Sequence, residues 1–323
     1  GVDRPGDMSH LLSIAKPNIT VVTALGEIPI HVEYFKDPED LFKEKSLLVK
    51  SLPTDGIAIL NHDDYVVYDM KERTKAKIIT FGFEEKSDVR AINYELHTTR
   101  EGDIGEVPEG ISFKIDYQGS IVPIRLRQCF GRAPVYASLA ASAAGLALKQ
   151  NLVDIAGALG DWSTPPGRLR LIKGIKKSFI LDDTYNAGPE SMRVALDTLQ
   201  TLPGKRKIAV LGDMLEIGKY TEQAHRAVGD QVAKFADIIF TIGIRAKFIA
   251  EEAISQNFPK DKVFVFDDAV SAGEALDPLI QSGDLILVKA SQGIRLEKTV
   301  EEIMAYPEQA GKLLVRQDEY WSR

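Results

Sequence analysis

Short apolar runs alternate with helix-like patterns along the C-terminal half of the sequence. A helical stripe follows Pro189, where Met192, Ala195, Leu196 and Leu199 fall on one face. Because the runs between such stripes are apolar at nearly every position, we expect both faces of each strand to be covered. This alternation predicts an α/β unit with a mainly parallel sheet. The expected strands are residues 177–183, 207–213, 237–243, 262–267 and 284–290.

The N-terminal half begins with the same alternation and then changes. Between residues 76 and 129 the pattern is one of strands and turns, and Gln118-Gly119 marks a hairpin. The segment DWSTPPGR at 161–168 is the best linker, since paired prolines end helices and favour extended chain. We therefore expect two domains, residues 1–164 and 165–323. Expected helices are residues 8–17, 37–52, 135–150 and 151–160, and expected early strands are residues 18–25 and 56–64.

Composition narrows the class of protein. The 323 residues include 40 Lys and Arg against 47 Asp and Glu, a formal charge of −7, and no basic run, which argues against a nucleic-acid surface. The longest strongly apolar run, residues 136–148, is shorter than the roughly 20 residues that span a bilayer, so no membrane span is expected. Cys129 is the single cysteine and cannot form an internal disulfide, which fits a reducing cytoplasm.

Several common catalytic motifs are absent from the sequence. It contains no Gly-x-x-x-x-Gly-Lys-Ser/Thr phosphate loop and no Gly-x-Gly-x-x-Gly after a strand, which disfavours a simple dehydrogenase. It also contains no His-Glu-x-x-His and no Gly-x-Ser-x-Gly, which removes the usual zinc-protease and esterase interpretations.

Polar residues cluster where the first strand of the C-terminal unit ends. Asp182 to Asn186 lie between that strand and the helix at Pro189, where open α/β sheets usually bind ligands. Carboxylates there can hold a ribose hydroxyl or a metal-bound phosphate, but helix capping by Asp183 or Thr184 is an equally good interpretation. Arg168 could bind a phosphate through its guanidinium fork, although a solvated linker arginine is the simpler alternative.

The sequence pattern alone gives little reason to assign a function to His31 or Lys45. A lone histidine is usually structural, and a helical lysine usually extends its ammonium to solvent. Lys45 has apolar neighbours at Leu41, Leu47 and Leu48, which predict a partly buried position.

Two stretches of the sequence are specific enough to indicate a family: DDTYNAGPESM (182–192) and LGDMLEIG (211–218). With these stretches the sequence resembles the Mur ligase family, most closely its branch that adds D-alanyl-D-alanine, and the resemblance covers nearly the whole chain. It implies a central α/β domain followed by a Rossmann-like C-terminal domain. The further matching stretches are residues 4–27, 43–48, 55–64, 167–174, 193–210, 224–229 and 287–301.

The resemblance implies ATP and Mg²⁺ as cofactors and a ligase that acts in the cytoplasm as a monomer. UDP-N-acetylmuramoyl-tripeptide and D-Ala-D-Ala would be its substrates: ATP phosphorylates the peptide carboxylate, and the dipeptide amine displaces phosphate. His31 would be a magnesium ligand, and Lys45 would be carbamoylated, because a plain ammonium would repel the cation.

The remaining implied roles concern nucleotide and amino-acid substrate. Arg168 would contact phosphate and Asp183 the ribose, with Asn61 also at the nucleotide. Tyr185 and the catalytic Asn186 would lie between the nucleotide and the amine. On and after the last expected strand, Lys289, Ser291 and Arg295 would face the amino-acid substrate.

The sequence departs from the family pattern at three residues and lacks several of the family's parts. Ala137, Gly188 and Gln292 replace an adenine-reading Asn, a common Asn and a frequent Arg. The family's N-terminal domain, phosphate loop and magnesium-binding glutamate are not in the sequence, so we expect a truncated central domain and no activity from this chain alone. The alternatives are a non-catalytic Mur-ligase-like binding protein and a family ligase with another amino-acid acceptor.

Overall fold

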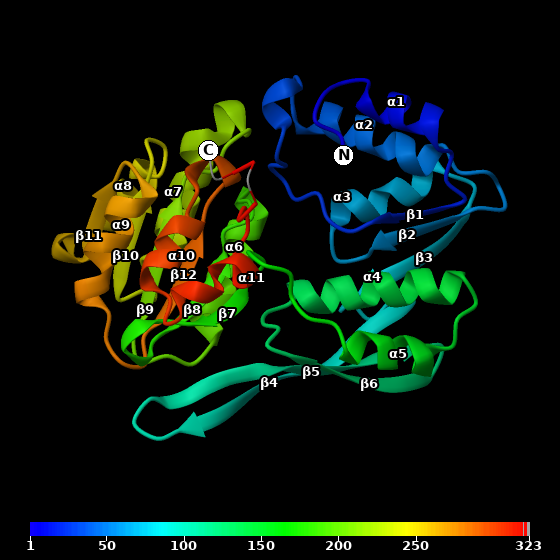
Figure 1. The fold of residues 1–323 in the computed structure, drawn as a ribbon. Coiled ribbons are helices and arrows are strands. Elements are labelled where there is room, and N and C mark those ends of the chain that lie inside the picture. The colour runs from blue at the N-terminus through cyan, green and yellow to red at the C-terminus, as the bar shows by residue number, and fades with distance from the viewer. Residues whose placement is uncertain (319, 322–323) are drawn as a thin grey trace.

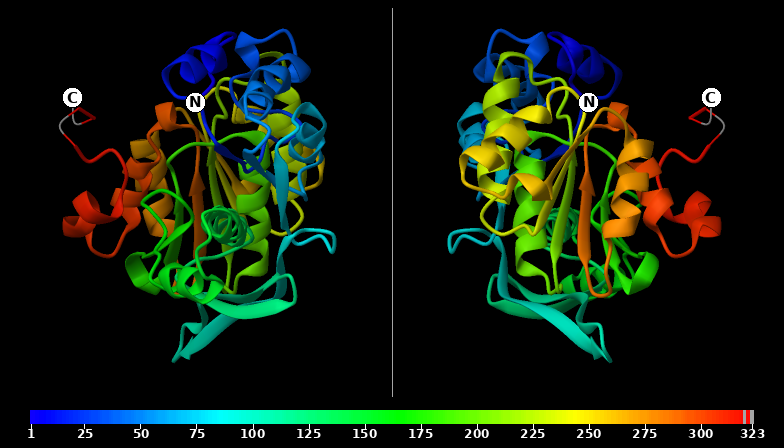
Figure 2. Two further views of the ribbon diagram at one scale, coloured as in Figure 1. Left: turned by 90° about the vertical axis from the view of Figure 1, so that its right-hand side faces the viewer. Right: turned by 90° about the vertical axis from the view of Figure 1, so that its left-hand side faces the viewer.

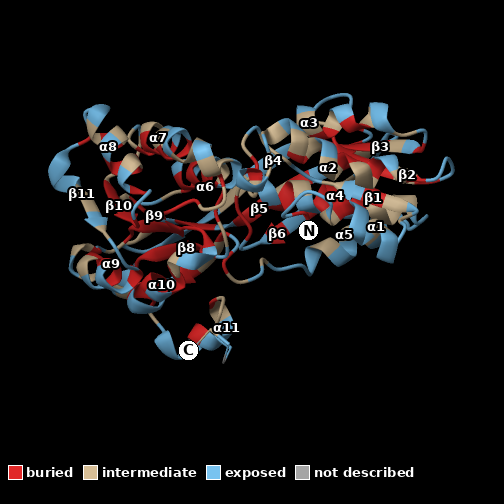
Figure 3. Ribbon diagram, turned by 90° about the horizontal axis from the view of Figure 1, so that it is seen from above, coloured by how far each residue is buried: buried red, intermediate tan, exposed pale blue. Residues whose placement is uncertain are grey.

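Two six-stranded sheets organise the chain. The structure is a computed structural model that describes residues 1–318, 320 and 321. Figure 1 shows the N-terminal half, blue to green, beside the C-terminal half, green to red. In both halves the buried residues lie along the strands and the sheet-facing sides of the helices (Figure 3). Within the described residues, no helix is both long and apolar enough to cross a membrane.

The N-terminal sheet is mixed, with three parallel and two antiparallel strand pairings. Its order is β1-β2-β3-β4-β5-β6, with parallel pairing from β1 to β4 and antiparallel pairing from β4 to β6. The strands are β1 (Ile19–Val22), β2 (Ile57–Asn61), β3 (Lys77–Gly82), β4 (Val89–Glu101), β5 (Gly105–Tyr117) and β6 (Ser120–Arg127). The helices are α1 (Asp7–Ile14), α2 (Pro38–Lys50), α3 (Tyr65–Tyr68), α4 (Ala133–Ala147) and α5 (Leu152–Gly160).

The strands β4 and β5 form a long arm. Both central residues of the β5–β6 turn, Gln118 and Gly119, have positive φ angles, as the predicted hairpin requires. At the other end of the arm, Lys205 Nζ of the C-terminal half donates to the Asp103 carbonyl at 2.6 Å. Figures 1 and 2 show the arm projecting from the N-terminal half. The arm therefore links the two halves through its tip.

The C-terminal sheet is parallel except for one edge strand. Its order is β11-β10-β9-β12-β8-β7, and β7 alone pairs antiparallel within it. The strands are β7 (Arg170–Lys173), β8 (Phe179–Asp183), β9 (Lys207–Gly212), β10 (Ile238–Ile242), β11 (Val263–Phe266) and β12 (Leu285–Lys289). The helices are α6 (Pro189–Thr201), α7 (Thr221–Val232), α8 (Lys247–Ser255), α9 (Ala269–Leu276), α10 (Glu297–Ile303) and α11 (Ala310–Leu313).

Helices cover both faces of this sheet. Residues of α6, α7 and α8 share one apolar cluster with the strands, and residues of α9, α10 and α11 share the other. The chain runs from β9 outward through β10 to β11 and then returns to β12 on the other side of β9. Strands β9 and β12 thus flank the point at which strand order reverses, where open α/β sheets place their ligands at the carboxyl ends.

The predicted architecture is confirmed as two mainly parallel α/β sheets. All five strands expected in the C-terminal unit are present within two residues of the predicted ends, and α6 begins at Pro189. Residues 161–169 connect α5 to β7. The domain boundary at residues 164 and 165 stays a prediction, and it falls inside that connection.

Candidate active site

A buried ion pair lies at the carboxyl ends of β8 and β12. These strands are paired in parallel with Lys289 opposite Asp183, which places the two side chains together. Lys289 Nζ donates to Asp183 Oδ2 at 2.6 Å and to the Asn186 carbonyl at 2.9 Å. Lys289 is 1% exposed and Asp183 is 6% exposed. Both charges are removed from water, so each is compensated by the opposite charge of the other, and removal of one would leave the other buried without a partner.

Asp182 and Asp183 fasten the preceding bend to the end of β8. Asp182 Oδ2 accepts from the Gly167 amide at 3.0 Å, and Asp183 Oδ1 accepts from the Leu169 amide at 3.1 Å. Burial raises the pKa of Asp182 to about 6, although hydrogen bonds from Thr184 favour its charged form. The aspartates therefore fix the backbone on both sides of Arg168.

Arg168, Tyr185 and Asn186 share this end of the sheet. The Arg168 guanidinium carbon lies 3.9 Å from the Tyr185 ring centroid, and both side chains are exposed. Asn186 Oδ1 accepts from the Ala187 amide at 2.9 Å. The capping interpretation of Asp183 and Thr184 is wrong, because the N-cap of α6 is Gly188.

Ser291 joins three loops at the point of strand reversal. Its hydroxyl accepts from the Leu215 amide at 2.9 Å and donates to the Ala187 carbonyl at 3.1 Å. Its amide donates to the Asp213 carbonyl at 2.9 Å. The hydroxyl is buried and fully engaged, so in this structure Ser291 holds the loops together rather than pointing into solvent.

Arg295 turns toward the C-terminal segment. Its Nε pairs with the buried carboxylate of Glu297, and its Nη2 donates to the Trp321 carbonyl at 3.2 Å. Arg295 has a left-handed backbone conformation with φ of 62°. The predicted contact between Arg295 and an amino-acid substrate stays a prediction, and its present partners are protein groups.

His31 lies at the seam between the two halves. Its amide donates to the Glu216 carbonyl at 2.8 Å, its Nδ1 is 3.1 Å from Glu216 Oε2, and its Nε2 is 3.4 Å from Asp3 Oδ1. Lys45 is half-buried, as its neighbours predicted. Burial lowers the pKa of Lys45, and the charge of Asp3 acts in the opposite direction. Asp3 thus interacts with both predicted metal-site residues.

These residues fit a cation site in part. His31 Nδ1 is buried and makes no aligned hydrogen bond among the described residues, although Glu216 Oε2 lies 3.1 Å away. However, in residues 1–318, 320 and 321 no group of three or more His, Cys, Asp or Glu side chains is arranged to hold a metal ion. Further ligands are needed, and a carboxylate added to Lys45 would be one.

Asn61 is a structural residue of the N-terminal sheet. Its Nδ2 donates to the Thr23 carbonyl at 2.8 Å, and its Oδ1 accepts from the Asp63 amide at 3.0 Å. Because both ends of the amide are engaged at the carboxyl ends of β1 and β2, the side chain shapes this edge. Its predicted contact with the nucleotide stays a prediction.

Two polar residues near these sites were not assigned roles from the sequence. Asp213 follows β9 and accepts from the amides of Arg245 and Ala246, so the end-of-strand rule would have found it. His225 is fully buried: its Nδ1 lies 2.7 Å from the Thr221 carbonyl, and its Nε2 accepts from the Met214 amide. Burial lowers the pKa of His225, which favours the neutral ring.

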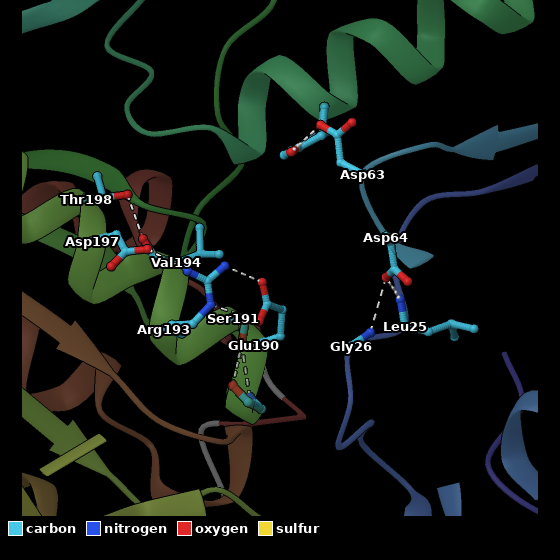
Figure 4. A network of polar contacts seen from close by, with 12 residues as sticks. Leu25, Gly26, Asp63, Asp64, Glu190, Ser191, Arg193, Val194, Asp197 and Thr198 are labelled. Carbon is cyan, nitrogen blue, oxygen red and sulfur yellow. Dashed lines mark hydrogen bonds and ion pairs between the residues drawn. The ribbon is translucent and has the colours of Figure 1, made fainter. Parts of the chain in front are cut away.

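The side of α6 that faces the N-terminal half carries its own ion pairs (Figure 4). Arg193 contacts Glu190 at 2.6 Å, and a Cβ built on Gly26 would lie 3.2 Å from the Glu190 Cβ. On the N-terminal side, Asp64 accepts from the Leu25 amide at 2.7 Å and from the Gly26 amide at 3.3 Å. The two halves are therefore in close contact beside the His31 loop.

The polar cluster of the C-terminal unit lies at the carboxyl ends of a parallel sheet, which is where open α/β sheets bind their ligands. The Mur ligase middle domain matches residues 1–145, and the Mur ligase, glutamate ligase domain matches residues 167–292. The chain belongs to the Mur ligase family, whose members are ATP-dependent amide ligases.

Its relatives include two curated UDP-N-acetylmuramoyl-tripeptide–D-alanyl-D-alanine ligases. The Bacillus subtilis protein is 30% identical over 311 residues, which are 95% of this chain and 64% of that protein. The Escherichia coli protein is 28% identical over 309 residues, which are 94% of this chain and 64% of that protein. The chain thus spans just under two thirds of either relative.

Solved structures agree in fold. A crystal structure of MurF from Acinetobacter baumannii superposes with a TM-score of 0.79 at 26% identity, covering 93% of this chain and 62% of that one. MurF ligase from Thermotoga maritima, solved with ADP, gives a TM-score of 0.77 at 24% identity and covers 96% of this chain and 66% of that one. The second likeness supports the fold alone.

Proposed function

We propose that the protein containing this chain joins D-alanyl-D-alanine to a UDP-N-acetylmuramoyl-peptide at the expense of ATP. The observation that carries the proposal is the buried Asp183–Lys289 pair at the carboxyl ends of β8 and β12, with Arg168 and Tyr185 beside it. The Bacillus and Escherichia relatives are UDP-N-acetylmuramoyl-tripeptide–D-alanyl-D-alanine ligases, and this similarity supports the proposed acceptor and peptide substrate.

Each residue of the cluster has a task in such a reaction. Exposed Arg168 would bind phosphate oxygens through its planar fork. Asp183 retains lone pairs beyond its contacts with Lys289 and Leu169 and would accept from a ribose hydroxyl. Tyr185 and Asn186 would orient the incoming amine, while Lys289 holds the strand ends in register and supplies positive potential.

The reaction would proceed in two transfers. The peptide carboxylate attacks the terminal phosphorus of ATP, giving an acyl phosphate and ADP. The dipeptide amine then attacks the acyl carbon and loses a proton, and the resulting tetrahedral intermediate expels inorganic phosphate. Mg²⁺, held by His31 and a carbamoylated Lys45, would neutralise charge on the phosphates. An intact-mass measurement in bicarbonate would test the extra carboxyl group on Lys45.

The test uses the whole protein with ATP, Mg²⁺ and UDP-N-acetylmuramoyl-tripeptide. D-Ala-D-Ala is compared with glutamate, lysine and diaminopimelate as the amine. We expect phosphate release only with D-Ala-D-Ala, together with a product whose mass is the sum of both substrates less one water. Product with another amine would show a different family acceptor. Absence of product with every amine would favour a binding protein and refute the proposal.

A further inference from the structure

After α11 the chain runs back to the end of β8, and residues 314–318 form this returning segment. Figure 1 shows this C-terminal segment in red, running on from α11. Arg316, in a left-handed conformation with φ of 58°, directs its guanidinium at the backbone that follows β8. Its Nη1 donates to the Thr184 carbonyl at 3.1 Å, and its Nη2 donates to the Tyr185 carbonyl. The Arg316 side chain is only 6% exposed.

A buried carboxylate fixes Arg316 from the other side. Glu297, at the start of α10, has a side chain that is 1% exposed, and its Oε2 accepts from Arg316 Nη1 at 3.0 Å. Its Oε1 pairs with Arg295. Arg295 in turn lies against Trp321, with 5.2 Å between the guanidinium carbon and the ring centroid. One glutamate therefore connects the loop after β12 with the returning segment.

The neighbouring backbone is also in contact. A Cβ built on Gly167 would lie 2.8 Å from Val315 Cγ1, and the Gly167 carbonyl accepts from the Tyr185 amide at 3.1 Å. The returning segment thus packs on both bends that hold Arg168 and Tyr185. The Arg316 guanidinium carbon also lies 6.0 Å from the Tyr185 ring centroid, but both hydrogen bonds of Arg316 to these residues are made to main-chain carbonyls, so Arg316 restrains the main chain itself.

We propose that Arg316 is a positioning residue for nucleotide binding, because it holds the Thr184 and Tyr185 carbonyls and so fixes the segment that bears Asp183 and Asn186. The inference rests on the proposed function. A guanidinium offers five donors in a rigid fork and can bridge two successive carbonyls and a carboxylate at once. Without it the segment must be ordered by the nucleotide, and that ordering weakens binding.

The experiment compares Arg316→Ala and Arg316→Lys with wild type in the whole protein. ADP affinity is measured by calorimetry, amide hydrogen exchange is followed over residues 183–187, and KM is determined for ATP and for D-Ala-D-Ala. For R316A we expect about tenfold weaker ADP binding, faster exchange, and a similar rise in the KM for ATP without a change in the KM for the dipeptide. R316K keeps the charge but cannot bridge all three acceptors, so it should fall between R316A and wild type.

Arg226→Ala is the matched control. Arg226 pairs with Glu222 and Glu251 on the surface of α7 and α8, and we expect its removal to leave ADP affinity and exchange over 183–187 unchanged. ADP affinity of R316A within twofold of wild type would overturn the inference; if R316A does not fold, the same criterion applies to R316K. A wild-type protein that binds ADP but forms no amide bond refutes only the proposed function. A wild-type protein that binds no nucleotide refutes both.

Discussion

The two halves of the molecule place their candidate residues in very different surroundings. In the C-terminal half, Asp183, Lys289 and Ser291 are buried and hydrogen-bonded to one another's loops at the carboxyl ends of parallel strands. In the N-terminal half, His31 and Lys45 are only partly buried. The His31 ring contacts the carboxylates of Asp3 and of Glu216, which belongs to the other half.

The difference follows from how each element places its polar groups. Parallel strands end at a common edge, so residues far apart in sequence meet there, as Asp183 and Lys289 do across 106 positions. Lys45 instead lies on α2 and His31 on the loop before η1 (Val32–Tyr34), so no strand register fixes their distance. The C-terminal cluster is organised by its own sheet, whereas the position of His31 depends on its contact with Glu216 of the other half.

The largest effect should come from Lys289→Met. The substitution keeps the apolar stem but leaves the Asp183 carboxylate buried without its cation, which costs about 3–5 kcal/mol of the free energy of unfolding. Lys45→Met in the N-terminal half is the matched control, because its ammonium has no ion pair within bonding distance among the described residues, and should change stability by less than about 1 kcal/mol. Chemical denaturation of both variants measures the two values.

A second substitution separates charge from shape at this pair. Asp183→Asn in the Lys289→Met background removes the stranded carboxylate, so the double variant should recover part of the loss. Equal losses in Lys289→Met and Lys45→Met would contradict the idea that only the C-terminal half is organised around buried charge.

The next effect is a pH dependence of stability centred on Asp182. Its pKa is raised from 3.8 to about 6 by burial, so the folded protein binds this proton more tightly than the unfolded chain does. Ionisation of Asp182 therefore opposes folding: its contribution is most favourable below pH 4 and is lost as the pH rises to about 6. Over the full titration, this rise in the pKa of Asp182 corresponds to about 3 kcal/mol of the free energy of unfolding.

Asp182→Asn isolates this contribution. The difference in free energy of unfolding between wild type and D182N should fall by about 2 kcal/mol from pH 4 to 6.5. Asp268→Asn serves as the control of opposite sign, because hydrogen bonds from Ser271 and Val270 lower the pKa of Asp268 and its stabilisation grows with pH. A D182N difference that does not vary with pH would refute the assignment.

The sequence predicts the parallel strands well for a physical reason. Strands covered on both faces are apolar throughout, so the runs at β8, β9, β10 and β12 are visible without the structure. The β4–β5 arm leaves many residues exposed, and it meets the C-terminal half through the Asp103 carbonyl and through Val107, which packs in an apolar cluster of that half. The main-chain contact has no side-chain pattern to reveal it, and the apolar character of Val107 does not show which half it packs against.

The residues of the candidate site also differ in how far the sequence predicts them. Asp183 and Lys289 stand out because both lie where apolar runs end, but their pairing depends on strand order, which the sequence does not state. Glu216 opposite His31 and Arg316 at the Tyr185 carbonyl come from segments that return over long distances. Nothing in the local pattern around Arg316 distinguishes it from a surface arginine.

The smallest of the three effects tests the seam between the halves. A Cβ built on Gly188 would lie 2.5 Å from Ile30 Cγ1 of the N-terminal half. Gly188 has φ of −143°, so the backbone itself accepts a side chain, and Asn is a favourable N-cap residue for α6. Any destabilisation of Gly188→Asn must therefore come from the crowded contact with Ile30, which we expect to cost about 1–3 kcal/mol.

Two further variants decide whether that contact is responsible. Ile30→Ala makes room for the new side chain, so Gly188→Asn should destabilise much less in the Ile30→Ala background than in wild type. Gly157→Asn is the control, because nothing lies within 4 Å of a Cβ built on Gly157 in α5. If Gly188→Asn is equally destabilising with and without Ile30, the contact with Ile30 does not hold the halves together at this point, and the other contacts between them, such as His31–Glu216 and Lys205–Asp103, would have to account for their approach.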